Sequence, residues 1–188
     1  MLFRSLMDKA IGLLELSSLA SGYAALDTML KTAPVEVLLA RTICSGKYLV
    51  LIAGDVGSVR AAVAAGSNRE PTAVIAAETI AAVHEQVLPA LGGSVVPQLR
   101  GALGVVECFS VATAIRAADA ACKAADVNLL ELRAAMALGG KGYFTVTGSP
   151  GAVRAAVDEA SALAADEGLL VNAVVLTGPH PDLLAEVI

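Results

Sequence analysis

One pattern occurs twice along the 188-residue chain, and this duplication limits the possible folds more than any other feature of the sequence. The run A-I-G-L-L-E at 10–15 returns as A-L-G-V-V-E at 102–107, an offset of 92 positions. The same offset pairs identical residues, among them Asp27 with Asp119, Lys31 with Lys123 and Arg41 with Arg133. After a two-residue insertion, V-R-A-A-V at 59–63 returns at 153–157. Such self-similarity predicts two tandem copies of one structural unit.

Apolar periodicity within each copy predicts the element order β-α-β-β-α-β. In the first copy, strands are expected at 11–16, 35–43, 48–53 and 73–77, and the first helix at 19–32. This order is the split-βαβ arrangement, in which one antiparallel sheet carries both helices on one face. We therefore expect an α+β protein made of two tandem ferredoxin-like domains.

The start of the second helix is marked independently in the two copies. Asp55 and Ser149 can each accept hydrogen bonds from first-turn amides, and Pro150 follows where proline is best tolerated. Between the copies, residues 93–101 include glycine, serine and proline and are typical of a linker. We expect the first domain to span 1–92 and the second to span 102–188.

The chain is apolar without containing a long apolar run. Its mean hydropathy is +0.72, but a membrane-spanning helix requires about 20 nearly uninterrupted apolar residues. The most apolar stretch, 35–56, contains four charged residues, so we expect no span. Excess hydrophobicity then indicates surface that is buried between subunits. The first ten residues lack the apolar core of a secretory signal, which indicates a cytoplasmic protein.

Three cysteines at wide spacing do not suggest a disulfide framework. By the repeat offset, Cys108 and Cys122 each take the place of a leucine in the first copy, so both are expected to be small core residues. Cys44 falls opposite Met136, so only the first copy has a thiol at this turn. Taken by itself, Cys44 is expected to be an inert thiol in a turn.

No set of residues indicates catalysis. Gly46-Lys47 and Gly140-Lys141 lack the other residues of a phosphate-binding loop. His84 and His180 have no second ligand motif nearby, and Glu15 and Glu107 recur at strand ends without a distinct site. The net charge of −5 argues against a nucleic-acid partner. We assign no catalytic residue and expect a protein that is not an enzyme.

Three segments of the first copy carry a resemblance to a known family. A-I-G-L-L-E, A-A-L-D-T-M-L-K-T-A and G-D-V-G-S-V-R-A-A-V resemble the bacterial microcompartment shell domain, and the likeness covers 10–184. Single-domain members form flat hexamers, so the resemblance implies a homotrimer of hexagonal outline. It further implies a tile that meets other shell proteins edge to edge around enzymes in the cytoplasm, with Lys31 and Lys123 at the tile edge.

A fourth segment, R-T-I-C-S-G-K-Y-L at 41–49, resembles the pore segment of a tandem member that holds an iron–sulfur cluster on its threefold axis. The resemblance implies that Ile43, Cys44, Ser45 and Gly46 line a pore. It also implies one 4Fe–4S cluster per trimer, ligated by Cys44 of each chain, with a non-cysteine ligand on the fourth iron. Electrons would then cross the shell to or from an encapsulated or cytosolic redox enzyme.

Two alternative functions stay open at this point. In the first, the trimer is a shell tile whose pore passes a small metabolite and holds no metal. In the second, the chain is a soluble trimer of ferredoxin-like domains that binds a ligand between subunits, although no phosphate-binding loop supports it.

Overall fold

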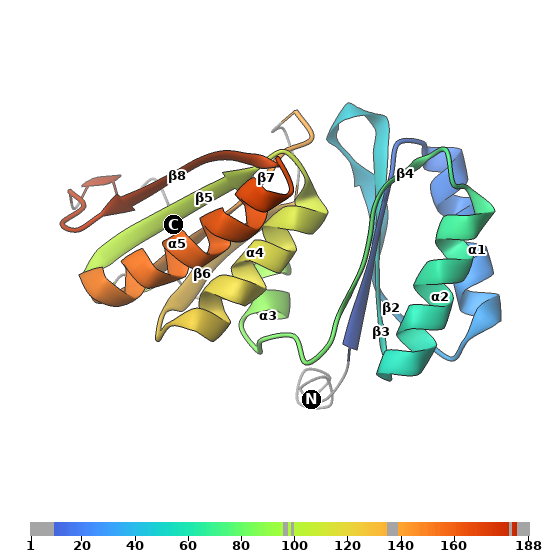
Figure 1. Cartoon of the computed structure of the whole chain (residues 1–188), viewed down its shortest axis with the longest axis horizontal. Coiled ribbons are helices and arrows are strands. Elements are labelled where there is room, and N and C mark those ends of the chain that lie inside the picture. Colours follow the sequence, from blue (N-terminus) through green and yellow to red (C-terminus); the bar gives the residue numbers. More distant parts are fainter. Residues whose placement is uncertain (1–9, 96–97, 99, 135–138, 181, 184–188) are drawn as a thin grey trace. The chain divides into compact units, whose positions relative to one another are not determined.

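The computed structural model describes residues 10–95, 98, 100–134, 139–180 and 182–183. The chain divides into two compact units, the first ending at Val83 and the second beginning at His84. Each unit contains a four-stranded antiparallel sheet, and within each unit two long helices lie side by side against one face of that sheet (Figure 1). The predicted α+β fold, with a split-βαβ unit built twice, is confirmed.

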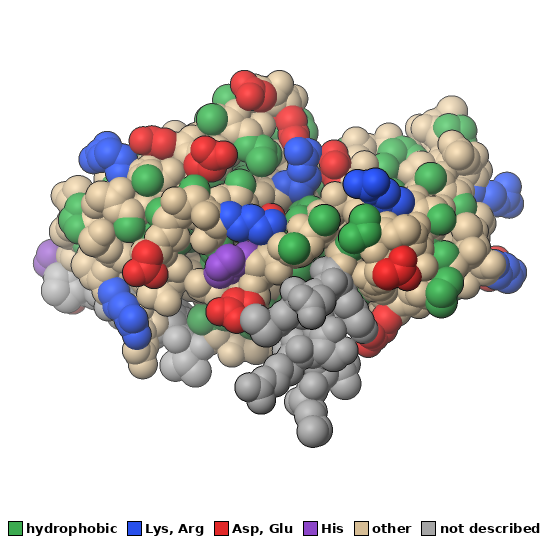
Figure 2. Space-filling model, turned by 60° about the horizontal axis from the view of Figure 1, so that its bottom comes forward, with side chains coloured by type: hydrophobic (Ala, Val, Ile, Leu, Met, Phe, Trp, Pro, Cys, Tyr) green, Lys and Arg blue, Asp and Glu red, His purple; other side chains and the backbone are tan. Residues whose placement is uncertain are grey.

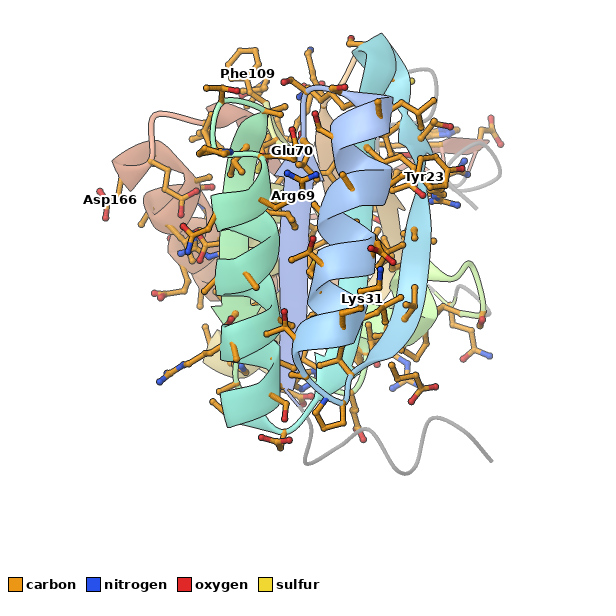
Figure 3. The ribbon with its side chains drawn as sticks, turned by 90° about the vertical axis from the view of Figure 1, so that its right-hand side faces the viewer. Tyr23, Lys31, Arg69, Glu70, Phe109 and Asp166 are labelled. Carbon is orange, nitrogen blue, oxygen red and sulfur yellow. The ribbon has the colours of Figure 1, made fainter. Side chains whose placement is uncertain are left out.

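The first unit has the sheet order β2-β3-β1-β4. Its strands are β1 (Ala10–Leu16), β2 (Glu36–Ile43), β3 (Lys47–Gly54) and β4 (Val74–Ile80), and its helices are α1 (Leu19–Thr32) and α2 (Val56–Arg69). The two helices cover the same sheet face in Figure 3, where α1 and α2 stand in front of β1. Leu14, Met29, Val50 and Val59 belong to the core between these layers.

The second unit repeats this plan with the sheet order β6-β7-β5-β8. Its strands are β5 (Ala102–Cys108), β6 (Asn128–Ala134), β7 (Gly142–Gly148) and β8 (Leu170–Leu176), and its long helices are α4 (Val111–Ala124) and α5 (Pro150–Asp166). A short helix, α3 (Val87–Leu91), precedes them. In the sequence α3 belongs to the end of the first repeat, but it packs against β6 and α4.

The repeat is preserved at the level of strand irregularities. The register between β2 and β3 shifts between Val37 and Leu39, and that between β6 and β7 shifts at the corresponding place, between Leu129 and Glu131. A bulge of this kind bends a strand and increases its twist, so the edge strand is distorted in the same way in both units. The two edge strands β2 and β6 therefore share one irregularity at the same place.

Side-chain caps fix the helix starts where the sequence predicts them. Asp55 Oδ1 accepts a hydrogen bond from Ser58 N at 2.9 Å, and Ser149 Oγ accepts one from Ala152 N at 3.3 Å. Hydrogen bonds from the Ser58 hydroxyl and amide lower the pKa of Asp55 below its usual value, because they favour the ionised carboxylate. The caps satisfy amides that the helix itself leaves without acceptors.

Glycine sets the distance between helix and sheet in both units. A Cβ on Gly12 would lie 2.6 Å from Val63 Cγ2, and a Cβ on Gly104 would lie 2.6 Å from Val157 Cγ2. Real side-chain carbons do not approach this closely, so any larger residue would push α2 or α5 away from its sheet.

The surface mixes charge signs. Acidic and basic side chains are interspersed over the face shown in Figure 2, with apolar side chains exposed between them. Among the described residues, no helix has both the length and the apolar character needed to cross a membrane.

Candidate functional site

The predicted pore residues lie together at one end of the β2–β3 hairpin (Figure 1). A short 3-10 turn, Cys44–Gly46, joins the two strands. Ile43 is buried, Cys44 is half-buried, and Ser45 and Gly46 are exposed. The turn closes through two left-handed residues, Ser45 at φ 67° and Gly46 at φ 71°. This conformation favours glycine and is strained for serine.

The tip of this turn is open. A Cβ built on Gly46 would meet no other atom within 4 Å. With only small side chains at positions 45 and 46, the backbone of another chain can approach Cys44 closely. The corresponding turn of the second repeat ends at Gly139 and Gly140, at φ 62° and 88°. Met136, the predicted counterpart of Cys44, lies outside the described residues.

An ion pair ties the turn to the sheet. Lys47, the first residue after the turn, places Nζ 2.9 Å from Glu15 Oε1, and the Glu15 side chain is fully buried on β1. In the second unit Lys141 Nζ lies 3.0 Å from Glu107 Oε1. Sequence reasoning left both glutamates without a role, although Glu15, Glu107, Lys47 and Lys141 all recur in the repeat. Each pair joins the start of one hairpin strand to an inner strand of the same sheet.

The other two cysteines are core residues, as predicted. Cys108 on β5 and Cys122 on α4 are both buried thiols. Burial raises the pKa of Cys108 to about 11, with smaller contributions from Glu167 and Glu107. Burial, with the charge of Asp119, raises the pKa of Cys122 to about 12. A thiolate is the form that ligates metal, so neither residue suits a metal site.

One chain alone does not form a metal site in the part of the structure that is described. No group of three or more His, Cys, Asp or Glu side chains among these residues is arranged to hold a metal ion. Cys44 is one sulfur donor at an open turn, and iron–sulfur clusters take several thiolates. The donor chemistry therefore fits such a cluster only where turns from several chains meet.

The two predicted edge lysines have the same local setting. Lys31 Nζ lies 2.6 Å from Asp27 Oδ2 near the end of α1, and Lys123 Nζ lies 2.6 Å from Asp119 Oδ2 near the end of α4. Lys31 extends from the outer side of α1 in Figure 3. The Lys31 side chain is 73% exposed and the Lys123 side chain 41% exposed, so Lys31 is the more accessible of the two.

The edge strands differ at one arginine. On β6, Arg133 is hydrogen-bonded to Glu131, whose other oxygen accepts a 2.8 Å hydrogen bond from the Tyr143 hydroxyl. Burial and this hydrogen bond raise the pKa of Tyr143 to about 12. On β2, the equivalent Arg41 has a buried Nε without a hydrogen-bond partner among the described residues. Sequence reasoning did not find this difference, because the glutamate is replaced by Leu39 while the arginine is kept.

The chain matches one family model twice. The BMC domain model matches residues 10–88 and 102–179, which together are most of the chain. The two matched ranges correspond to the two repeats.

Curated relatives cover the chain in two ways. The bacterial microcompartment shell protein PduT of Citrobacter freundii is 41% identical over 182 residues, which are 97% of this chain and 99% of PduT. The carboxysome shell protein CsoS1 of Prochlorococcus marinus is 37% identical over 89 residues. That match covers 46% of this chain and 86% of CsoS1, so CsoS1 has the size of one repeat.

Solved structures share the fold over most of the chain. A microcompartment protein from Desulfitobacterium hafniense DCB superposes with a TM-score of 0.85 at 42% identity, covering 94% of this chain and 98% of that one. The fused permuted hexameric shell protein MSM0275 from the RMM microcompartment superposes with a TM-score of 0.65 at 25% identity, covering 84% and 82%.

Proposed function

Because the chain belongs to the BMC-domain family and is a structural shell protein of a bacterial microcompartment, we propose that three copies form a hexagonal tile with the Cys44 turns at its axis. The relatives named above are structural shell proteins, which agrees with the expectation that this chain is not an enzyme. Each tile meets other shell proteins along its edges, where Lys31 and Lys123 make contacts.

The number of units supports a trimer. A single-domain relative such as CsoS1 has the length of one repeat, and this chain carries two. Three chains therefore supply the six units that a hexagonal tile of single-domain members contains. Cyclic symmetry brings the same residue of every chain to equal distances from the axis. A turn that exists once per chain then occurs three times around one point.

We further propose that the tile holds one 4Fe–4S cluster through Cys44 of each chain. The open turn and its small residues Ser45 and Gly46 support this, since they leave room for three loops to meet. The Lys47–Glu15 pair holds each turn in place. Three thiolates leave the fourth iron to a non-cysteine ligand. When bound, the cluster would supply one-electron transfer between the shell lumen and the cytosol, where a redox enzyme is the expected partner.

A metal-free pore is the second candidate. The observation in its favour is that each chain offers Cys44 as one sulfur donor. Among the described residues no group of metal ligands accompanies it. In this case Cys44 only lines a passage for a small metabolite, together with Ile43, Ser45 and Gly46.

Purification without oxygen separates the two. The cluster requires brown protein with a paramagnetic signal after reduction and about four irons per trimer. Cys44→Ser is expected to abolish colour and iron while trimers persist. Cys122→Ala is the matched control, because Cys122 is buried on α4 and is expected to keep iron at the wild-type level. Colourless, iron-free wild-type trimers would contradict the cluster and leave the metal-free pore.

A further inference from the structure

The edge strand β2 carries a guanidinium group whose inner nitrogen has no acceptor. Arg41 Nε is buried and makes no hydrogen bond in the part of the chain that the structure describes. A buried donor that is left without an acceptor carries the full cost of its lost hydration, and this cost is higher for a charged group. The residue as a whole is half-buried and β2 is an edge strand, so a small solute can reach the side chain from water. Arg41 is therefore a candidate for binding an anion.

The second unit shows what an arginine at this position binds. Arg133 lies at the same register of β6, and its Nε donates a hydrogen bond to one carboxylate oxygen of Glu131. The other oxygen of that carboxylate accepts a 2.8 Å hydrogen bond from the Tyr143 hydroxyl. A guanidinium and a carboxylate complement each other in charge and in geometry. The ligand of this position is therefore a carboxylate, which the second unit supplies from its own chain.

The first unit keeps the arginine and lacks both of the groups that accompany it in the second. By the repeat offset, Leu39 stands in the place of the glutamate and Leu49 in the place of the tyrosine. Leucine side chains offer no acceptor, so a carboxylate for Arg41 has to come from outside the unit. Leu39 lies two residues before Arg41 on the same face of the strand, and it is half-buried. Its apolar surface suits the hydrocarbon part of a small organic acid.

The charges near the two turns differ in the same sense. Glu15 and Arg41 both pair with Leu49, one from each neighbouring strand, so the two charged side chains share a face of the sheet. Glu15 lies 2.9 Å from Lys47 Nζ and is the countercharge of that lysine. The second unit has two ion pairs at the equivalent positions, one for each cation. The first unit therefore keeps both cations and only one of the two carboxylates.

We propose that Arg41 binds a small organic carboxylate, which takes the place that the Glu131 side chain has in the second unit. One ligand oxygen accepts a hydrogen bond from Nε and the other accepts one from a terminal N–H of the guanidinium. Because Nε is covered in the free chain, the side chain turns on binding, and the N–H that lacks an acceptor gains one.

The position of the site connects it with the pore. Arg41 precedes Cys44 by three residues, so in the tile proposed above three such sites surround the axis. This placement at the axis rests on the proposed trimer, whereas binding itself needs only one chain. A carboxylate is then the class of solute that the tile takes up beside its turns.

Titration of the full-length protein with acetate, exchanged for chloride at constant ionic strength, tests the site. We expect saturable binding to the wild type. Arg41→Met should weaken this binding about tenfold or more, because hydrogen bonds to a charged group are lost. Arg133→Met is the matched control, since Arg133 already holds Glu131, and it should bind acetate as the wild type does.

Exchange of single residues between the repeats gives a sharper test. Leu39→Glu builds into the first unit the carboxylate that the second unit has, and it should abolish acetate binding although Arg41 is still present. Glu131→Leu is the reverse change. It frees Arg133 of its internal ligand and should add a further acetate site to each chain.

Nuclear magnetic resonance of the arginine Nε–H groups locates the bound acetate. The Arg41 resonance, identified by its loss in Arg41→Met, should shift as acetate is added and should not respond in Leu39→Glu. Binding that Leu39→Glu leaves unchanged, or a wild type without saturable binding, would overturn the proposal. The titration requires neither iron nor trimers. A failure of the tile or of the cluster is therefore distinguished from a failure of this site.

Discussion

The ring of Tyr48 fills the space above Gly22, so that a Cβ on Gly22 would lie only 2.3 Å from Tyr48 Cδ1. The second unit has the opposite pair at the same positions, with Ala114 on the helix and Gly142 on the strand. There a Cβ on Gly142 would lie 2.8 Å from the Cβ of Ala114. In each unit the helix and the strand meet at one point, and a glycine on one side makes room for the residue on the other.

This exchange predicts that the effects of substitutions at Gly22 and Tyr48 on stability depend on each other. Gly22→Ala should destabilise the protein by about 1–3 kcal/mol, because the added methyl group overpacks against the Tyr48 ring. Denaturant unfolding measures the change. In a Tyr48→Gly background, which rebuilds the pair of the second unit, the same Gly22→Ala change should lose its cost. An equal cost in both backgrounds would show that the ring is not the obstacle.

Sequence patterns found the elements because periodicity and caps are local. Helix α1 was expected at 19–32 and lies at Leu19–Thr32, and the caps Asp55 and Ser149 were expected from residue type alone. The exchange of a small and a larger residue between positions 22 and 48 was missed, although the residues of both repeats can be read in the sequence. A size swap becomes visible only when two distant positions are known to touch.

The candidate site was predicted less completely. A resemblance placed Ile43, Cys44, Ser45 and Gly46 at one turn, and the structure brings them together. The buried partner of Lys47 was missed, because Glu15 lies 32 positions away and its burial depends on packing of β1. The two hydrogen bonds between the Gln86 side chain and the backbone of Val127 and Leu129 were also missed, because the partners lie more than 40 positions apart in the sequence.

The Lys47–Glu15 pair predicts different responses in the two units. Lys47→Met removes the cation that lies 2.9 Å from a fully buried carboxylate and should destabilise the protein by about 2 kcal/mol. Lys141→Met is the matched change in the second unit, where Glu107 is 33% exposed. It should cost less than about 1 kcal/mol, because water can solvate the carboxylate that is left. Denaturant midpoints measure both, and equal losses would contradict the role of burial.

The three thiols should differ in reactivity. The pKa values of about 11 for Cys108 and about 12 for Cys122 leave almost no thiolate at pH 8, and both side chains are buried. Iodoacetamide should therefore label Cys44 alone in native, iron-free protein and all three cysteines after unfolding. Mass spectrometry of digested peptides reads the result. Native labelling of Cys122 at the rate of Cys44 would contradict the core packing of α4.

The same two thiols make stability depend on pH. Burial raises both pKa values above the 9.0 of an ordinary thiol, so between pH 9 and the folded values the unfolded chain releases protons that the folded chain retains. The stability contribution is complete below pH 9 and is lost as pH rises towards about 11 and 12. Denaturant midpoints should fall above pH 9, and Cys122→Ala should make the fall shallower. An identical slope in that variant would exclude Cys122 as a source.

The edge role of lysine predicts a loss of sheets without a loss of trimers. The Lys31 side chain is 73% exposed and its pair with Asp27 is of the kind that contributes little to folding, so Lys31→Ala should leave stability nearly unchanged. Combined with Lys123→Ala, it removes the long side chains that we place along the tile rim. Electron microscopy should then show isolated tiles where the wild type forms two-dimensional arrays. Arg60→Ala, an exposed cation on α2, is the control and should keep arrays. Arrays that persist without both lysines would move the tile contact to other residues.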